Sequence, residues 1–518
     1  MPHTLVDTLV LKLTALLDQI GATADNHLWL GYSGGMDSEL LAYTLARFRE
    51  THPKTPYQVS LVHVHHGLSR NADAWAAHCR QRAEHYGLNF VLRKVQLELG
   101  PRVSIEAEAR RARYQAIAEL LNPGDILLTA HHQDDQLETL LLALKRGQGP
   151  KGLAAMGQAQ HLALISRAES APCWQLRPML DSSRAQIEQA VESLELPYIN
   201  DESNQDTQYD RNFLRAEVIP VLKQRWPSIA TTASRSAALC AEQQLLLDEV
   251  STEKLQPLLG RCRFSGVRVL DSAGLKVLSP QWQAQLLRQF IQMQRLPLPA
   301  QVQLQQALAQ LLDAREDAQL ELSFKGLFLR RYGQQIYAMA PLPEAAFQLL
   351  DGVGSVEDVA AKNSKLTLSQ KQLQALSQGQ SLSVGLTSPW QRLELTLADS
   401  GPRVALAQVM APLMASLSAP QLASLGAKVQ PSDAAAAPEL VMGLKGSYRC
   451  QPHNRDKGRE LKKLWHELGV PPWLRDRVPL LMQNGRLLAL AGGFVERSAL
   501  ASGAEPGIVL KLVAEATP

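Results

Sequence analysis

The sequence predicts an α/β protein: a doubly wound, mostly parallel sheet at the N-terminus, then a mainly helical middle domain and a mixed α/β C-terminal domain. Strand-like and helix-like segments alternate through the first two hundred residues, and a glycine-rich turn directly follows the first strand. After about residue 250 the pattern becomes mainly helical. Alternation of this kind implies right-handed crossovers between parallel strands.

The predicted elements of the first part follow in order along the chain. The expected strands are His27–Tyr32, Tyr57–His65, Asn89–Val95 and Asp125–Ala130. The expected helices are Ser38–Arg49, Asp73–Tyr86, Ser104–Leu121 and Asp134–Lys145. Because ligands of such sheets bind at the carboxyl ends of the strands, unusual residues at those ends are candidates for a site.

The rest of the chain divides by composition. A helical stretch is expected from Phe213 to about Val250, then amphipathic helices at Gln281–Gln294 and Ala300–Ala314 followed by two strands. Residues 401–440, rich in Ala, Leu, Ser and Pro, predict a loosely packed insertion. We expect domains at 1–220, 251–341 and 342–518, with 221–250 as a helical connector.

Composition excludes several classes of protein. At ~150 residues per domain, 518 residues suggest about three domains. No apolar run approaches the ~18 residues of a membrane span, and the N-terminus does not read as a signal peptide. Five scattered cysteines without a CxxC pair predict reduced thiols in a cytoplasmic protein, and no zinc or disulfide framework.

Positive charge is concentrated in one segment. The net charge is only +3, yet Lys445–Arg477 holds nine Lys and Arg against four Asp and Glu. Such a segment fits contact with phosphates, and the alternative is an ordinary solvated face.

The strongest motif is the turn Ser33-Gly34-Gly35-Met36-Asp37-Ser38, which follows a strand and opens a helix. Two glycines allow a tight turn, and the N–H groups at the helix start form an anion site to which serine hydroxyls add donors. Asp37 is unexpected beside an anion unless it holds Mg²⁺ or orients a donor. The turn is neither a Walker A loop nor a GxGxxG motif, and a plain serine-capped turn is the alternative.

Two further groups of charged residues stand beside this loop in the predicted fold. Glu106, Arg110 and Arg113 share one helical face, either as a surface ion-pair ladder or with Arg113 reaching phosphates. Asp134, Asp135 and Glu138 gather where a strand meets a helix. Asp134 could simply cap that helix, and His131 and His132 could simply be buried and hydrogen-bonded. A carboxylate pair beside a nucleotide suits a cationic second substrate.

These motifs resemble a known family. Ser33–Ser38 resembles the PP-loop of the ATP pyrophosphatases, which adenylate a carbonyl oxygen and release pyrophosphate. The successive motifs of tRNA(Ile)-lysidine synthetases resemble segments of this chain at His63–Leu68, Glu106–Tyr114, Leu128–Thr139, Lys145–Leu153, Arg177-Pro178, Asp201–Pro220 and Lys457–Leu481. One departure is His65, where many members carry Asn, and we assign it no role.

The resemblance implies a reaction and a site. The C2 carbonyl of the first-anticodon-position cytidine of a CAU-anticodon tRNA(Ile) would be adenylated by ATP with Mg²⁺, and free L-lysine would then displace AMP to give lysidine, which changes codon reading from AUG to AUA. The PP-loop and Arg113 would bind ATP. The lysine and adenylate site would be lined by His131, Asp135, Glu138 and Arg211. The resemblance does not assign a separate role to each of them.

The resemblance also implies contacts with tRNA far from the reacting base. The candidate phosphate-binding residues are Lys457, Arg459, Lys462, Lys463 and Arg475. Trp465 and Trp473 are expected in the core instead. No membrane contact is expected, and the sequence leaves a homodimer open.

Alternative functions predict different residues. A tRNA thiolation enzyme should carry paired cysteines or an iron–sulfur set, and an asparagine synthetase needs a cysteine where Pro2 stands. A glutamine amidotransferase domain would need its own cysteine nucleophile. A non-enzymatic RNA-binding protein with a decayed loop should have lost Ser33, Asp37 or Glu138, and all three are present.

Overall fold

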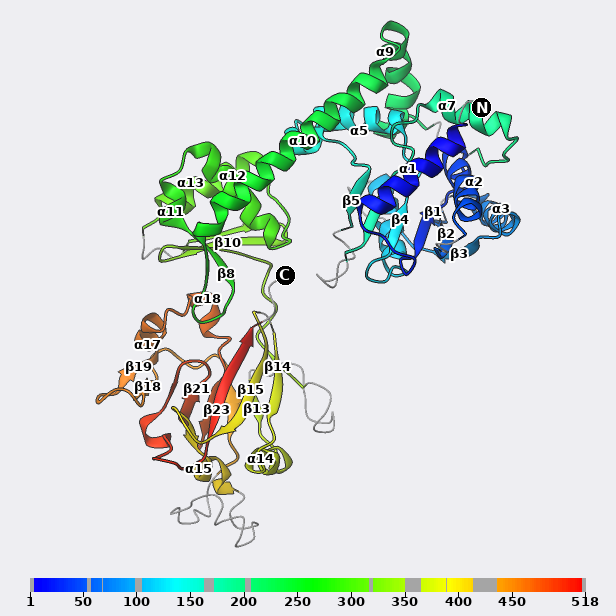
Figure 1. Cartoon of the computed structure of the whole chain (residues 1–518). Helices are drawn as coiled ribbons and strands as arrows, with labels where there is room; N and C mark the ends of the chain where they lie inside the picture. The colour runs from blue at the N-terminus through cyan, green and yellow to red at the C-terminus, as the bar shows by residue number, and fades with distance from the viewer. Residues whose placement is uncertain are drawn as a thin grey trace. The chain divides into compact units, whose positions relative to one another are not determined.

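The computed structural model describes residues 4–53, 57–67, 69–97, 105–162, 172–200, 206–315, 320–349, 365–387, 389–412 and 436–514. The chain divides into two compact units, Met1–Glu249 and Val250–Pro518 (Figure 1). No helix among the described residues has the length and apolar character needed to cross a membrane.

A six-stranded sheet forms the centre of the first unit, in the order β3-β2-β1-β4-β6-β5 (Figure 1). Its strands are β1 (Leu28–Gly31), β2 (Val59–His65), β3 (Asn89–Lys94), β4 (Ile126–Leu128), β5 (Ala159–His161) and β6 (Trp174–Leu176). All neighbours pair in parallel except β5, which runs antiparallel to β6 at the edge. The predicted doubly wound, mostly parallel sheet is confirmed.

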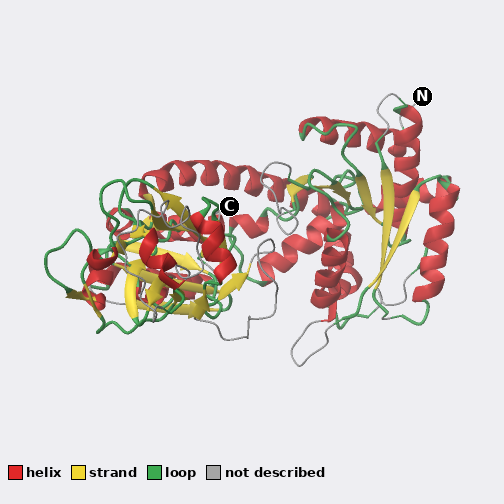
Figure 2. Cartoon of the chain, turned by 90° about the horizontal axis from the view of Figure 1, so that it is seen from below, coloured by secondary structure: helices red, strands yellow, loops and turns green. Residues whose placement is uncertain are grey.

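Helices cover both faces of this sheet, as Figure 2 shows for the part of the chain at the right. They are α1 (Leu5–Gln19), α2 (Met36–Thr51), α3 (Ala72–His85), α4 (Ile105–Ala118), α5 (Gln133–Lys145), α6 (Pro150–Leu153) and α7 (Arg184–Ser193). Leu28 and Leu30 of β1 pack with α1, α2, α3 and α7, whereas Trp29 between them packs with Ile117 of α4. This alternation is the period of two that a strand buried on both faces requires.

The strand order reverses beside β1. The chain runs from β1 outward to β2 and β3, and then returns to β4 on the other side of β1. The carboxyl ends of β1 and β4 therefore flank the point where the strand order reverses, which is where ligands bind in open α/β sheets.

The expected helical stretch after residue 213 is helical but broken into pieces. It consists of α8 (Asp210–Phe213), a π-helical turn η2 (Leu214–Val218), α9 (Ile219–Arg225) and α10 (Ile229–Leu255). Pro220 has no N–H for the carbonyl four residues earlier, and the widened turn directly precedes it. Pro227 disfavours helical geometry for Trp226, which adopts φ −130° and ψ 85° and ends α9.

The second unit begins with helices packed on an antiparallel sheet in the order β7-β8-β11-β10-β9. Its elements are a 3-10 turn (Gln256–Leu258), β7 (Leu259–Arg261), β8 (Arg268–Asp271), α11 (Ser272–Lys276), α12 (Pro280–Met293), α13 (Gln301–Asp313), β9 (Leu320–Phe324), β10 (Leu327–Tyr332) and β11 (Gln335–Met339). The two amphipathic helices match their expected positions. Three strands follow α13 rather than the expected two, and two more, β7 and β8, precede the helices without having been predicted. Strands as short as β7 and β8 show no clear alternation.

Two five-stranded sheets share the last core of the chain. The first holds β12 (Phe347–Leu349), β14 (Leu382–Leu386), β15 (Trp390–Ala398), β23 (Gly507–Ala514) and β16 (Val404–Ala405). The second holds β13 (Lys365–Thr367), β17 (Glu439–Val441), β20 (Leu480–Gln483), β21 (Arg486–Leu490) and β22 (Phe494–Val495). The described residues also include α14 (Gln370–Ser377), α15 (Leu406–Met410), α17 (Leu461–Glu467), α18 (Pro472–Arg475), a 3-10 turn (Arg497–Ala499) and the hairpin of β18 (Arg449–Cys450) with β19 (Arg459–Glu460).

The insertion expected at 401–440 is described only at its two ends. Residues 401–412 contain β16 and α15, and residues 436–440 begin β17. The remainder of that prediction lies outside the described residues.

Candidate active site

The turn Ser33–Gly35 joins β1 to α2 in a conformation that requires glycine. Gly34 has φ +81°, and a Cβ atom there would lie 2.6 Å from Cδ1 of Ile199 and 2.8 Å from Sγ of Cys79. The turn is held on both sides: the Ile199 N–H donates to the Gly34 carbonyl at 2.8 Å, and the Gly35 N–H donates to Oγ of Ser33 at 3.3 Å. A side chain at position 34 would therefore displace the loop.

The start of α2 presents backbone amides rather than side chains. Gly35 is the N-cap and no side chain caps the helix there, while Met36 points into the core with 7% of its surface exposed. Oγ of Ser38 donates to the Gly35 carbonyl at 2.9 Å and lies 3.1 Å from Oγ of Ser33. This combination of free amides, two hydroxyls and a helix N-terminus suits a phosphate.

The buried carboxylate of Glu39 holds Tyr32, the residue that precedes the loop. Glu39 has no exposed surface and accepts hydrogen bonds from the hydroxyls of Tyr32 and Tyr86 and from Nε of Arg82, the last at 2.8 Å. Burial raises the pKa of Tyr32 well above its usual range, so its hydroxyl stays a donor. Because Tyr32 directly precedes Ser33, this network ties the loop to α2 and α3.

Two acids and one arginine meet at the first turns of α5. Arg215, from the π-helical turn, donates through Nε to Oε1 of Glu138 at 2.9 Å and through a terminal nitrogen to Oε2 at 3.1 Å. The same nitrogen lies 3.4 Å from Oδ1 of Asp135. Burial raises the pKa of Glu138 despite Arg215. Burial acts in the same direction on Asp135, but His132 and His131 outweigh it and the pKa of Asp135 is lowered.

His132 connects these acids to the loop. Its Nε2 lies 3.5 Å from Oδ2 of Asp135 and 3.8 Å from Oδ1 of Asp37. Its Nδ1 accepts the backbone N–H of Asp134 at 3.2 Å, so a neutral ring carries its proton on Nε2, toward both carboxylates. His132 thus lies between the carboxylate at the start of α2 and the carboxylate on α5.

Asp37 has the character of a metal ligand. Its Oδ1 is buried and makes no hydrogen bond among the described residues, and its Oδ2 lies 3.7 Å from a terminal nitrogen of Arg184 in α7. Burial raises the pKa of Asp37, which a bound cation would reverse. In the described part of the chain no three His, Cys, Asp or Glu side chains form a complete metal site. One carboxylate fits Mg²⁺, which takes most of its other ligands from water and substrate phosphates.

Positive charge surrounds His131 on the other side of the site. Its Nδ1 lies 2.9 Å from Oγ1 of Thr129. Burial lowers the pKa of His131 strongly; Asp135 opposes this, and Arg177, Arg110 and Arg211 add to it. The ring is therefore neutral at pH 7.

Arg113 and Arg211 lie in this positive region. Burial and Arg113 lower the pKa of His66 to about 4. Arg211 donates to Oγ1 of Thr139 at 3.4 Å, next to Glu138. On α4 the observed ion pair joins Glu108 and Arg111 at 2.6 Å, rather than Glu106 and Arg110 as in the expected ladder. Arg113 makes no hydrogen bond among the described residues, which leaves its guanidinium available to a ligand.

The first unit therefore contains every candidate catalytic and nucleotide-binding residue. The loop follows β1, and His131, Asp135 and Glu138 follow β4. Arg211 lies near enough to act on the charge of both His131 and Arg113. The segment Asp201–Asn204, part of the family-like motif, lies outside the described residues, as does Leu68.

The candidate tRNA-binding residues lie in the second unit. Arg459 pairs with Glu467 at 3.0 Å, Lys462 pairs with Glu460 at 3.2 Å, and Nε of Arg475 donates to the Val470 carbonyl at 3.1 Å. Lys457 and Lys463 are exposed and form no ion pair among the described residues.

Both tryptophans beside these residues pack into the protein. Trp465 is 3% exposed, and Trp473 contacts the rings of Tyr332 and Tyr337. Arg330 lies over the Trp473 ring at 5.1 Å.

Sequence reasoning missed four residues that organise the site: His132 as the bridge, Arg215, Arg184 and Glu39. Arg215 stands within the family-like motif, and the two buried acids on α5 required a cation near them. No local sequence pattern identifies Arg184 or Glu39 as site residues, because their partners come from other elements.

Comparison with known proteins finds three family models that match successive parts of the chain. Family models described as PP-loop domain, TilS substrate binding domain and TilS substrate C-terminal domain match residues 6–222, 270–337 and 441–512. A solved structure of a U34-tRNA thiolase from Methanococcus maripaludis is 18% identical, with a TM-score of 0.34, and the match covers 45% of this chain and 78% of that one. A similarity that low indicates nothing about function.

Two relatives match almost the whole chain. The tRNA(Ile)-lysidine synthase of Shewanella oneidensis is 48% identical over 492 residues, which are 95% of this chain and 96% of that protein. The enzyme of the same name from Escherichia coli O157:H7 is 36% identical over 483 residues, covering 92% and 94%. With this identity over nearly its full length, the chain belongs to the tRNA(Ile)-lysidine synthase family, ligases built on a PP-loop domain that uses ATP.

Proposed function

We propose that this chain joins free L-lysine to C2 of the first-anticodon-position cytidine in a CAU-anticodon tRNA(Ile), converting ATP to AMP and pyrophosphate. The observation that carries the proposal is the contact line from Asp37 through His132 to Asp135 and Glu138. It puts a phosphate-binding loop directly beside buried carboxylates that suit a cationic nucleophile.

In the first step the C2 carbonyl oxygen attacks the α-phosphorus of ATP, and pyrophosphate leaves. The amides at the start of α2, with Ser33 and Ser38, hold the phosphates, and Arg113 offers a guanidinium to them. Mg²⁺, when bound at Asp37, would offset negative charge on the leaving oxygens.

In the second step the ε-amine of lysine attacks C2, and the former carbonyl oxygen leaves as part of AMP. The amine is mostly protonated at pH 7 and must first lose a proton. Basicity follows pKa, so Glu138, whose pKa is raised by burial, is the strongest base among the three candidates. Asp135, with its lowered pKa, stays ionised and attracts the ammonium, while neutral His131 accepts or donates a hydrogen bond.

The domains expected from the sequence divide this work. Residues 1–220 perform the chemistry, 221–250 connect, and 251–341 and 342–518 bind tRNA. Of the five basic candidates, Lys457 and Lys463 suit phosphate contact best, because both are exposed and neither forms an ion pair among the described residues.

The test is incorporation of labelled lysine into a CAU-anticodon tRNA(Ile) transcript, with and without ATP. A methionine tRNA with the same anticodon is the control. ATP-dependent labelling of the isoleucine tRNA alone is the expected result. Pyrophosphate release without labelling would show another nucleophile, and no reaction in either assay would contradict the proposal.

A further inference from the structure

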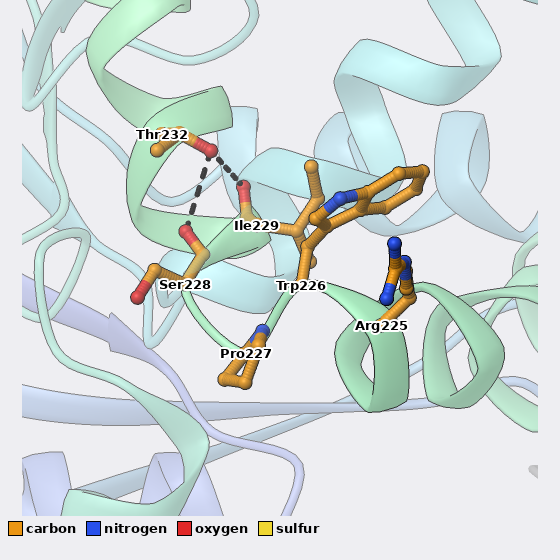
Figure 3. Close-up of a pocket in the computed structure, with 6 residues that line it drawn as sticks. All are labelled: Arg225, Trp226, Pro227, Ser228, Ile229 and Thr232. Carbon is orange, nitrogen blue, oxygen red and sulfur yellow. Dashed lines mark hydrogen bonds between the residues drawn. The ribbon is translucent and has the colours of Figure 1, made fainter.

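The turn between α9 and α10 forms a hollow on the surface of the first unit. The hollow has a volume of about 530 Å³. It is lined by Arg225, Trp226, Pro227, Ser228, Ile229 and Thr232, all drawn in Figure 3. Trp226 is 56% exposed, which is unusual for the largest apolar side chain. An indole exposed to this extent is a candidate contact for a ligand.

Hydrogen bonds brace the hollow on two sides. The backbone N–H of Trp226 donates to the Leu222 carbonyl at 2.7 Å, and the backbone N–H of Ile229 donates to the Trp226 carbonyl at 3.0 Å. On its other side the Thr232 hydroxyl bonds the carbonyls of Ser228 and Ile229, shown as dashed lines in Figure 3. The turn is therefore preformed, and a ligand entering it would pay little ordering entropy.

Both flanks of the hollow are anchored to the first turn of α5. Lys223, two residues before Arg225, lies with its Nζ 2.6 Å from Oδ1 of Asp134. Thr231, next to Thr232, donates to Oε1 of Gln133 at 3.3 Å. Ala230 and Ala233 of α10 pack with Leu137. The hollow thus adjoins the start of α5, the helix that carries Asp135 and Glu138.

An exposed indole beside a guanidinium suits a nucleobase that has left its stack. A base stacks on the ring without regard to its identity, and the arginine neutralises the adjoining phosphate. The large aromatic side chains exposed in the described chain are Tyr198, Phe213 and Trp226, and of these Trp226 lines the hollow.

We propose that this hollow holds an unpaired nucleobase of the tRNA substrate, next to the nucleotide that enters the active site. Trp226 provides the stacking platform and Arg225 contacts the phosphate. The inference rests on the proposed function, because it requires the anticodon loop to be opened at this unit. It adds a subsite that positions the loop without touching the reacting atoms.

The test compares kinetic constants of Trp226→Ala, Trp226→Phe and Val221→Ala. Val221 is the matched control, since it is a 63% exposed apolar residue of α9 that does not line the hollow. Loss of the platform should raise KM for tRNA(Ile) about tenfold, which equals about 1.4 kcal/mol, with KM for ATP and lysine unchanged. Trp226→Phe should retain most of the affinity, and Val221→Ala all of it.

A direct readout uses transcripts with 2-aminopurine at single positions of the anticodon loop. One position should be quenched on binding the wild type and not on binding Trp226→Ala. Thermal unfolding checks that the variants are folded, and Arg225→Ala gives a second route to the same site.

Each outcome separates the two proposals. If the wild type fails to modify tRNA(Ile), the proposed function is wrong. If the wild type is active and Trp226→Ala keeps both its KM for tRNA and the quenching, the subsite alone is wrong. A raised KM for ATP instead would place the adenine of ATP on Trp226 and overturn the assignment to tRNA.

Discussion

The charged cluster at α5 and the basic segment Lys445–Arg477 are both rich in charge but organised in opposite ways. At α5, Asp135 and Glu138 are both held by Arg215 from the π-helical turn, and Glu138 has no exposed surface. In the basic segment the pairs lie at the surface, as between Lys462 and Glu460. Buried charges that pair between distant elements hold the site residues in place. Exposed positive charges instead attract an anionic ligand.

The difference has an energetic consequence. Removing one partner of a buried pair leaves an uncompensated charge and costs about 3–5 kcal/mol. An exposed pair contributes about 0–1 kcal/mol, screened by salt. Substitutions in the two regions should therefore differ in size and in the property that they change.

The largest effect is expected at Asp37. Asp37→Asn removes the negative charge that suits Mg²⁺, so pyrophosphate release should fall by about a hundredfold to a thousandfold. The thermal unfolding temperature should stay close to that of the wild type, since Oδ1 makes no hydrogen bond among the described residues. The control is Asp181→Asn, which alters an exposed pair with Lys12. Near-normal turnover in Asp37→Asn would remove this residue from the site.

The next effect concerns stability rather than chemistry. Glu39→Ala leaves Arg82, Tyr32 and Tyr86 without their shared acceptor and should lower the unfolding free energy by about 3–5 kcal/mol. Glu467→Ala removes the exposed acid that pairs with Arg455 and Arg459, and should change it by at most about 1 kcal/mol. Urea denaturation of both variants measures the contrast, and equal losses would contradict it.

A smaller effect depends on pH. The pKa of His131 is lowered from 6.5 by burial, so the unfolded chain binds more protons as the pH falls. Stability present at pH 7 is therefore lost below about pH 6.5. Relative to His131→Gln, the wild type should lose about 1 kcal/mol between about pH 6.5 and 5.5. His466→Gln, at an exposed position of α17, is the control, and parallel pH curves for wild type and His131→Gln would refute the assignment.

The smallest effects are expected in the basic segment. Lys457→Ala and Lys463→Ala should each weaken tRNA binding by a few-fold and reduce the slope of log affinity against log salt by about one. The rate at saturating tRNA should not change. Filter binding over a salt series measures the slope, and a slope equal to that of the wild type would show that these lysines do not contact phosphates.

Local patterns in the sequence predicted much of the first unit. The four predicted strands and the four predicted helices are present, because each segment has a clear hydrophobic period and ends at turn-forming residues. Gly34 and Gly35, between β1 and α2, are an example. The positions of the loop and of the α5 acids followed from those elements. The break at Pro227 was missed because the flanking segments are both helical in pattern.

The partners of the site residues could not be predicted in the same way. Arg215 meets Glu138 across 77 positions of sequence, from a π-helical turn on a different element. His132 bridges two carboxylates because it caps α5 and faces α2 at once. Such contacts are set by tertiary packing, to which the local pattern contributes only the residue types.

The most direct test of the proposed chemistry follows one oxygen atom. A tRNA(Ile) carrying ¹⁸O at C2 of the first anticodon cytidine is incubated with ATP, Mg²⁺ and lysine, and the AMP is analysed by mass spectrometry. Adenylation of that oxygen predicts one ¹⁸O in AMP for each lysidine formed. Unlabelled AMP, with the ¹⁸O retained in the tRNA, would contradict the account.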